Sequence, residues 1–154
     1  MSYLIDTNVL SELRRKEPNP CVVAWFEERP ATTLYVSVLT LGEIRKGIEA
    51  LGKSERKLKL LDWFETELPA FFSGRVLPID EEVADRWGRL LAAARRPLPA
   101  IDSLLAATAL THGLALVTRN VNDFPHLDLE IINPWERSKG SESDRSPRNS
   151  GTQA

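Results

Sequence analysis

Four acidic residues stand where apolar segments give way to polar turns, and their side chains are of the kind that holds metal ions. They are Asp6, Glu43, Asp102 and Asp123. Asp6 directly follows a short apolar run and Asp123 lies a few residues past another. We therefore expect both beyond the carboxyl ends of strands, where open α/β sheets place their sites. Glu43 and Asp102 fall in the predicted first turns of two helices with apolar residues at helical spacing.

The four carboxylates meet at one point if both helices reach the same edge of the sheet. Two unit charges about 4 Å apart repel by roughly 4 kcal/mol at an effective dielectric constant near 20. Such a cluster therefore predicts a hard divalent cation, and Mg²⁺ or Mn²⁺ suits ligation by oxygen alone. We predict Asp6 and Asp102 as direct ligands. Asp123 would complete the shell or act through water, and Glu43 would bind a second ion or orient the nucleophile.

Metal ions held in this way hydrolyse phosphodiester bonds, because they activate a water molecule and neutralise the charge that grows on phosphorus. Three short polar residues are candidates for supporting the carboxylates or a bound water by hydrogen bonds: Asn8, Thr118 and Asn120. For each acid alone, a helix cap or a turn is the simpler interpretation. The set of four favours a site, because Thr7, Asn8 and Ser37 already offer cap chemistry to the adjacent helices.

The composition is typical of a single globular domain. The chain has 154 residues, a net charge of −2 and one cysteine, Cys21. One cysteine excludes an intrachain disulfide and a multi-cysteine metal site, which fits a reducing compartment. Acids and bases are interspersed, so charge alone does not indicate a polyanion ligand. No apolar run approaches the roughly 20 residues of a membrane span and no basic leader precedes the first strand pattern, so we expect a soluble, cytoplasmic protein.

Strand and helix patterns alternate along the chain. Short apolar runs predict strands at residues 3–5, 34–36, 75–79, 115–117 and 130–132. Helical spacing and capping residues predict helices at about 9–16, from 20 onward, after Ser37, at 54–68, after Asp80 and after Pro99. This order predicts a parallel α/β sandwich with right-handed crossovers. Residues 138–154 contain no large apolar side chain, so we expect a domain over 1–137 followed by a disordered tail.

The order of the short motifs resembles the PIN-domain family. The resemblance lies in Ile5-Asp6-Thr7-Asn8, in Glu43 with Gly47 four residues on, in DSLLAATA at 102–109, and in Thr118-Arg119-Asn120 followed by Asp123-Phe124. It covers about residues 2–135, and within the family it points to the VapC toxins of bacterial type II toxin–antitoxin modules, in particular the FitB-like branch. It implies a PIN-like three-layer α/β/α sandwich with a central parallel sheet of four to five short strands. It also implies a Mg²⁺- or Mn²⁺-dependent ribonuclease whose acids match Asp6, Glu43, Asp102 and Asp123.

The resemblance further implies a homodimer that a cognate VapB-like antitoxin holds inactive. It also implies that the complex of the two proteins binds its own promoter DNA. Two functions stay open. One is an endoribonuclease toxin that hydrolyses RNA, and the other is a weakly catalytic or non-catalytic partner in a DNA-binding complex for transcriptional autoregulation. The four acids favour the enzyme. A phosphotransfer domain fits less well, because Asp6-Thr7-Asn8 lacks the second acid of a haloacid-dehalogenase-type motif.

Overall fold

The computed structural model is an α/β fold built on a five-stranded sheet, and it describes residues 1–121 and 127–136. The strand order is β3-β2-β1-β4-β5, and each pairing is parallel. Helices cover both faces, so the predicted three-layer α/β/α sandwich is confirmed. Asp123 and the predicted tail at 138–154 lie outside the described residues.

The strands are short, and their order creates a place for a site. They are β1 (Tyr3–Ile5), β2 (Leu34–Ser37), β3 (Val76–Leu77), β4 (Ala115–Val117) and β5 (Ile131–Ile132). Tyr3 pairs with Leu34 on one side and with Ala115 on the other. The chain runs outward from β1 to β3 and then returns to β4, on the other side of β1. Ligand sites of open α/β sheets form where the two directions diverge, beyond the carboxyl ends of the strands.

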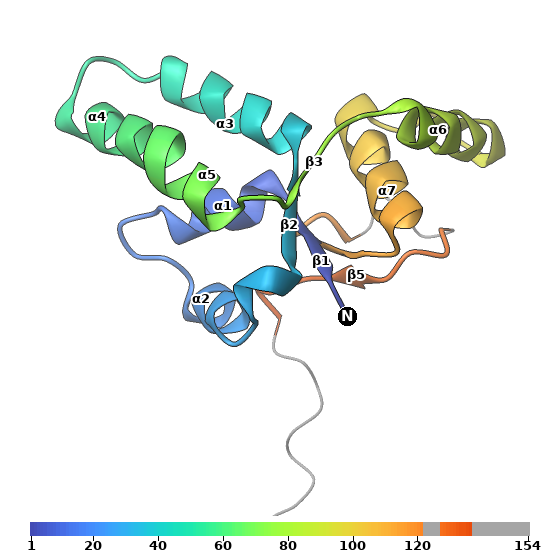
Figure 1. The fold of residues 1–154 in the computed structure, drawn as a ribbon, viewed down its shortest axis with the longest axis horizontal. Coiled ribbons are helices and arrows are strands. Elements are labelled where there is room, and N and C mark those ends of the chain that lie inside the picture. The colour runs from blue at the N-terminus through green and yellow to red at the C-terminus, as the bar shows by residue number, and fades with distance from the viewer. Residues whose placement is uncertain (122–126, 137–154) are drawn as a thin grey trace, which may run out of the picture.

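The helices form two groups, one on each face of the sheet (Figure 1). The first group contains α1 (Thr7–Leu13), α2 (Pro20–Glu27), α3 (Val38–Glu49), α4 (Glu55–Asp62), the π-helix η2 (Trp63–Glu67) and α5 (Leu68–Phe71), and a 3₁₀-helix η1 (Ala31–Thr33) leads into β2. The second group contains α6 (Glu81–Ala93) and α7 (Ala100–His112). Successive strand residues face opposite cores, because side chains alternate along a strand. Ile5 and Val117 lie in the core under the first group, whereas Leu4 and Leu116 pack with Leu105 of α7.

Local sequence signals account for most helix ends. Asn19, Ser37, Ser54 and Asp80 each accept a hydrogen bond from a backbone N–H in the first turn of the following helix. Gly113 ends α7 in the left-handed conformation, with φ of 64°. The helices predicted to begin after Ser37 and after Asp80 are confirmed. In the described part of the chain, no helix is both long enough and apolar enough to cross a membrane.

The helix predicted at 54–68 has an irregular second half. It widens into η2 and continues through α5 to Phe71. We attribute the π-turn to Pro69, because a proline inside a helix lacks an N–H and its ring collides with the carbonyl four residues earlier, here that of Glu65. The segment presents Trp63 to the end of α1, where the guanidinium carbon of Arg14 lies 5.1 Å from the centre of the indole.

Candidate active site

Asp6 is the centre of the candidate site and lies immediately beyond β1. Its backbone N–H donates to the carbonyl of Val117 at 2.9 Å, which extends the pairing of β1 with β4 by one residue. Its side chain is only 7% exposed, and Oδ1 accepts a hydrogen bond from the backbone N–H of Thr7 at 2.7 Å. Asp6 is therefore the N-cap of α1, and the predicted cap role of Thr7 and Asn8 is wrong. Extended backbone continues from β1 through Asp6, so Thr7 is already the first helical residue.

Two further side chains hold the Asp6 carboxylate. Thr118, which is buried directly after β4, donates its hydroxyl hydrogen to Oδ2 at 2.7 Å. Asn8 Nδ2 donates to the same oxygen at 3.4 Å and to Thr118 Oγ1 at 3.2 Å. The backbone N–H of Asn120 also donates to Thr118 Oγ1, at 3.1 Å. The three candidate supporting residues thus lie in one network around Asp6, and Asn120 takes part through its backbone.

Glu43 reaches the same place from α3, which packs against α1. Its Oε1 accepts a hydrogen bond from the hydroxyl of Thr7 at 2.8 Å. Thr7 therefore joins the two acidic residues, since its N–H holds Asp6 and its hydroxyl holds Glu43. The prediction that Glu43 lies in the first turn of its helix is wrong. Because α3 begins at Val38, directly after Ser37, Glu43 lies in the second turn. No pattern in the sequence indicates that Thr7 links the two acids.

The surroundings of Asp6 raise the pKa of its carboxyl above the ordinary value of 3.8. Burial is the largest cause, because it penalises the charged form, and the negative charge of Glu43 acts in the same direction. Hydrogen bonds from Thr118 and from the backbone of Thr7 lower the pKa without cancelling the effect of burial. A bound cation would favour the ionised carboxylate and so offset the effects of burial and of the Glu43 charge.

The oxygen atoms of this pair suit a hard cation. A carboxylate has about four lone-pair positions, and three donors approach Asp6, one at Oδ1 and two at Oδ2. These hydrogen bonds leave a position on Oδ1 for a metal ion, and Glu43 contributes a second carboxylate beside it. Mg²⁺ and Mn²⁺ prefer such oxygen ligands. The residues present therefore fit a divalent metal.

Asp102 lies on α7, which covers the other face of the sheet. It is half-buried in the first turn of α7. Because α7 leads through Gly113 into the start of β4, its first turn lies toward the carboxyl edge (Figure 1). Within residues 1–121 and 127–136, no three Asp, Glu, His or Cys side chains are arranged to hold a metal ion. This part of the chain therefore assembles the pair of Asp6 and Glu43, while Asp123 lies outside it.

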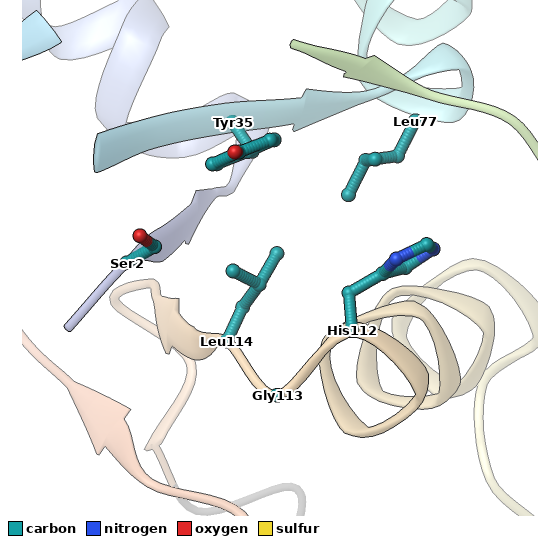
Figure 2. Close-up of a pocket in the computed structure, with 6 residues that line it drawn as sticks. All are labelled: Ser2, Tyr35, Leu77, His112, Gly113 and Leu114. Carbon is teal, nitrogen blue, oxygen red and sulfur yellow. The ribbon is translucent and has the colours of Figure 1, made fainter. Parts of the chain in front are cut away.

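A separate cavity of about 250 Å³ lies away from these residues. Figure 2 shows its lining side chains, which are Ser2, Tyr35, Leu77, His112, Gly113 and Leu114. Ser2 and Leu114 precede β1 and β4, so the cavity lies toward the amino ends of these strands, whereas Asp6 lies beyond the carboxyl end of β1. None of the candidate residues lines it, and it is not part of the site.

Known proteins resemble this chain over most of its length. Residues 3–129 match the model of the PIN domain. VapC ribonuclease Y4jK of Sinorhizobium fredii is 37% identical over 136 residues, which cover 86% of this chain and 97% of that protein. Toxin FitB of Neisseria gonorrhoeae is 36% identical over 135 residues, with coverage of 86% and 97%. The solved structure of FitAB bound to an IR36 DNA fragment is similar with a TM-score of 0.82 and 34% identity, and the match covers 88% of this chain and 96% of that one.

Proposed function

Because this chain belongs to the PIN-domain family, we propose that it is a metal-dependent endoribonuclease and the toxin of a type II toxin–antitoxin module. The observation that carries the proposal is the pair of Asp6 and Glu43, in which a buried carboxylate with a raised pKa lies beside a second carboxylate. Relatives at 37% and 36% identity are named a ribonuclease and a toxin, which supports it. Such an enzyme would act in the cytoplasm, where its RNA substrate is found.

The proposed metal ligands are Asp6, Glu43, Asp102 and Asp123, and the ion is Mg²⁺ or Mn²⁺. When bound, the metal supplies positive charge and a water of lowered pKa for attack on the phosphodiester. The protein's own contribution is to fix the carboxylates before the substrate arrives. Thr118 and Asn8 hold one oxygen of Asp6, and Thr7 holds Glu43. Groups fixed in this way need little reorganisation during the reaction.

The test measures cleavage of a fluorescent single-stranded RNA by purified variants. Asp6→Asn and Asp102→Asn keep the shape of the side chain but remove its charge, so each should abolish cleavage while the fold persists by circular dichroism. Asp80→Asn is the matched control, because Asp80 is also an aspartate N-cap, in front of α6. The control should cleave RNA at the wild-type rate. Full cleavage by Asp6→Asn with Mg²⁺, or by the wild-type protein in excess EDTA, would refute the proposed chemistry.

We also propose that the chain forms a homodimer, that a cognate VapB-like antitoxin inhibits it, and that the complex binds promoter DNA. The support is the similarity to FitAB bound to a DNA fragment, which covers 88% of this chain. Coexpression with the neighbouring upstream reading frame should yield a complex that copurifies, and light scattering should give two copies of this chain in it. High recovery of the chain alone from cells that grow normally would contradict the toxin role.

A second candidate function is a weakly catalytic partner in a DNA-binding complex for autoregulation. One observation favours it, since the solved structure of FitAB bound to an IR36 DNA fragment is similar to this chain over 88% of its length. The two functions differ in their measurable output. A toxin cleaves RNA as a purified protein with Mg²⁺, whereas a regulatory partner leaves RNA intact and increases operator binding by the antitoxin.

A further inference from the structure

Arg119 and Trp135 meet beside the candidate site although 16 positions separate them in the chain. Each follows a strand, β4 for Arg119 and β5 for Trp135, and these two strands are neighbours in the sheet. The backbone N–H of Thr118 donates to the carbonyl of Ile132 at 2.9 Å, which ties the two strand ends together. The guanidinium carbon of Arg119 then lies 5.1 Å from the centre of the Trp135 indole.

This arginine is close to the metal-binding residues. It directly follows Thr118, and its backbone N–H donates to Asn8 Oδ1 at 3.4 Å. Both Thr118 and Asn8 donate to the carboxylate of Asp6. Two hydrogen bonds therefore connect the backbone of Arg119 to the central acid of the site, while its side chain remains exposed to solvent.

Trp135 gives the guanidinium a fixed position. The indole is half-buried and packs against the core that contains Val117, and its backbone N–H donates to Asn133 Oδ1 at 3.0 Å. A cation over an indole face is attracted by the ring quadrupole and loses part of its freedom. Within the described residues, Arg119 forms no salt bridge. Its charge is thus held over the indole and is not paired with any carboxylate of the described residues.

We propose that Arg119, held by Trp135, binds a backbone phosphate of single-stranded RNA next to the bond that is cleaved. A guanidinium has a planar array of N–H donors that can bind a phosphate through two parallel hydrogen bonds. A cation at this place also offsets the repulsion between the RNA backbone and the acidic pair. The inference rests on the proposed ribonuclease function and adds a substrate-binding residue to it.

The structure supplies a matched control for this pair. Arg14 lies over Trp63 at the same distance, 5.1 Å, and is also exposed. Arg14 is the C-cap of α1, however, and Asp6 is its N-cap. Since the 7 residues of α1 lie between them, the two are separated by about 12 Å along the helix axis. If cation–π pairs act only in holding the fold, the two arginines should behave alike.

Two measurements on the intact chain test the proposal. The first is the KM and kcat for cleavage of a fluorescent single-stranded RNA oligonucleotide with Mg²⁺. Arg119→Ala should raise KM about tenfold, as expected for a lost charge-assisted hydrogen bond, and should change kcat much less. Arg119→Lys should have a KM between those of the wild type and Arg119→Ala, because a lysine is a point charge without the planar donor array. Trp135→Phe should also raise KM, since phenylalanine holds a cation less well than tryptophan. Arg14→Ala should match the wild type.

The second measurement is binding of the same oligonucleotide by fluorescence anisotropy at several KCl concentrations, in an Asp6→Asn background that does not cleave. Loss of one phosphate contact should reduce the slope of log affinity against log salt by about 0.7. A purely structural role would lower the melting temperature without changing this slope. Arg119→Ala should change the slope, and Arg14→Ala should leave it unchanged.

The outcomes separate this inference from the proposed function. If the wild-type protein cleaves RNA and Arg119→Ala has the same KM and salt slope, the function stands and the phosphate contact is refuted. Equal effects of Arg119→Ala and Arg14→Ala would also refute it, because they would indicate a general basic surface. If the wild-type protein does not cleave RNA, the proposed function fails. In that case the anisotropy measurement still tests the phosphate contact. The contact is refuted if Arg119→Ala leaves the slope of log affinity against log salt unchanged, or if the protein does not bind RNA.

Discussion

The hydroxyl of Thr118 donates a hydrogen bond of 2.7 Å to the carboxylate of Asp6, across the junction of two parallel strands. Both residues are buried, and each directly follows its strand. This bond lowers the pKa of Asp6, in opposition to burial and to the charge of Glu43, which raise it. Thr118 therefore helps to keep Asp6 in the ionised form that a metal ion requires.

We expect Thr118→Val to shift the acidic limb of the pH–activity profile. Removing the hydroxyl takes away a bond that lowers the pKa of Asp6, so protons should compete with the metal up to a higher pH. The midpoint of the acidic limb for RNA cleavage should therefore move to higher pH. Thr118→Ser keeps the hydroxyl and should restore the wild-type midpoint. Identical profiles for the valine variant and the wild type would show that this bond does not control Asp6.

Asp6→Asn should change how stability depends on pH in the absence of metal. The raised pKa of Asp6 means that the folded state binds its proton more tightly than the unfolded state does. This contribution to stability is fully present below about pH 3.8 and is lost as the pH rises through the folded-state pKa. An asparagine has no such dependence. Urea unfolding in EDTA should therefore show the variant gaining stability relative to the wild type over this pH range.

Addition of metal supplies the corresponding check. A ligand that binds only the folded state raises its stability, so Mg²⁺ should raise the melting temperature of the wild type at neutral pH and have little effect on Asp6→Asn. Asp80→Asn should respond to Mg²⁺ like the wild type, because its cap lies at α6. A metal response that is equal in all three proteins would place the ion away from Asp6.

Thr40→Val should stabilise the protein. Thr40 lies in α3, is fully buried, and its hydroxyl has no hydrogen-bond partner in the described structure. A buried polar group without a partner costs about 1–3 kcal/mol, and valine has nearly the same shape without the hydroxyl. The free energy of unfolding from urea denaturation should rise by about 1 kcal/mol. Thr108→Val is the control, because Thr108 is equally buried but donates to the carbonyl of Leu104 at 2.8 Å. A gain in the control as large as that in Thr40→Val would refute the explanation.

The sequence predicted those features of the fold that depend on residues close together in the chain. The alternation of strand and helix patterns gave the parallel sheet, and the caps at Ser37 and Asp80 followed from a short polar side chain in front of an apolar helical stripe. The start of α1 was predicted less well, because Asp6, Thr7 and Asn8 all carry side chains that can cap a helix. Only the continuation of β1 pairing through the N–H of Asp6 decides among them.

The contacts that build the site depend on packing between distant segments. Thr7 and Glu43 are 36 positions apart, and their hydrogen bond requires α1 to lie against α3. Likewise, Arg119 meets Trp135 only because β4 and β5 pair in one particular register. A single sequence gives the residue types at these positions but not the helix packing or the strand register. For this reason the sequence indicated the acidic residues and did not indicate Thr7 as their link.

Truncation after Arg137 should leave both stability and RNA cleavage unchanged. Residues 138–154 lie outside the described structure and contain no large apolar residue, so their removal should expose little apolar surface. Trp135 is the last large apolar residue that packs on the core, and the truncated chain retains it.

Thermal unfolding and the KM and kcat for RNA cleavage provide the measurements, and a second truncation before Trp135 serves as the contrasting variant. That shorter chain should lose stability and raise KM, because it removes the residue that holds Arg119. A loss of more than about 1 kcal/mol on removing 138–154 alone would exceed what exposed polar residues contribute and would show that this segment docks on the domain.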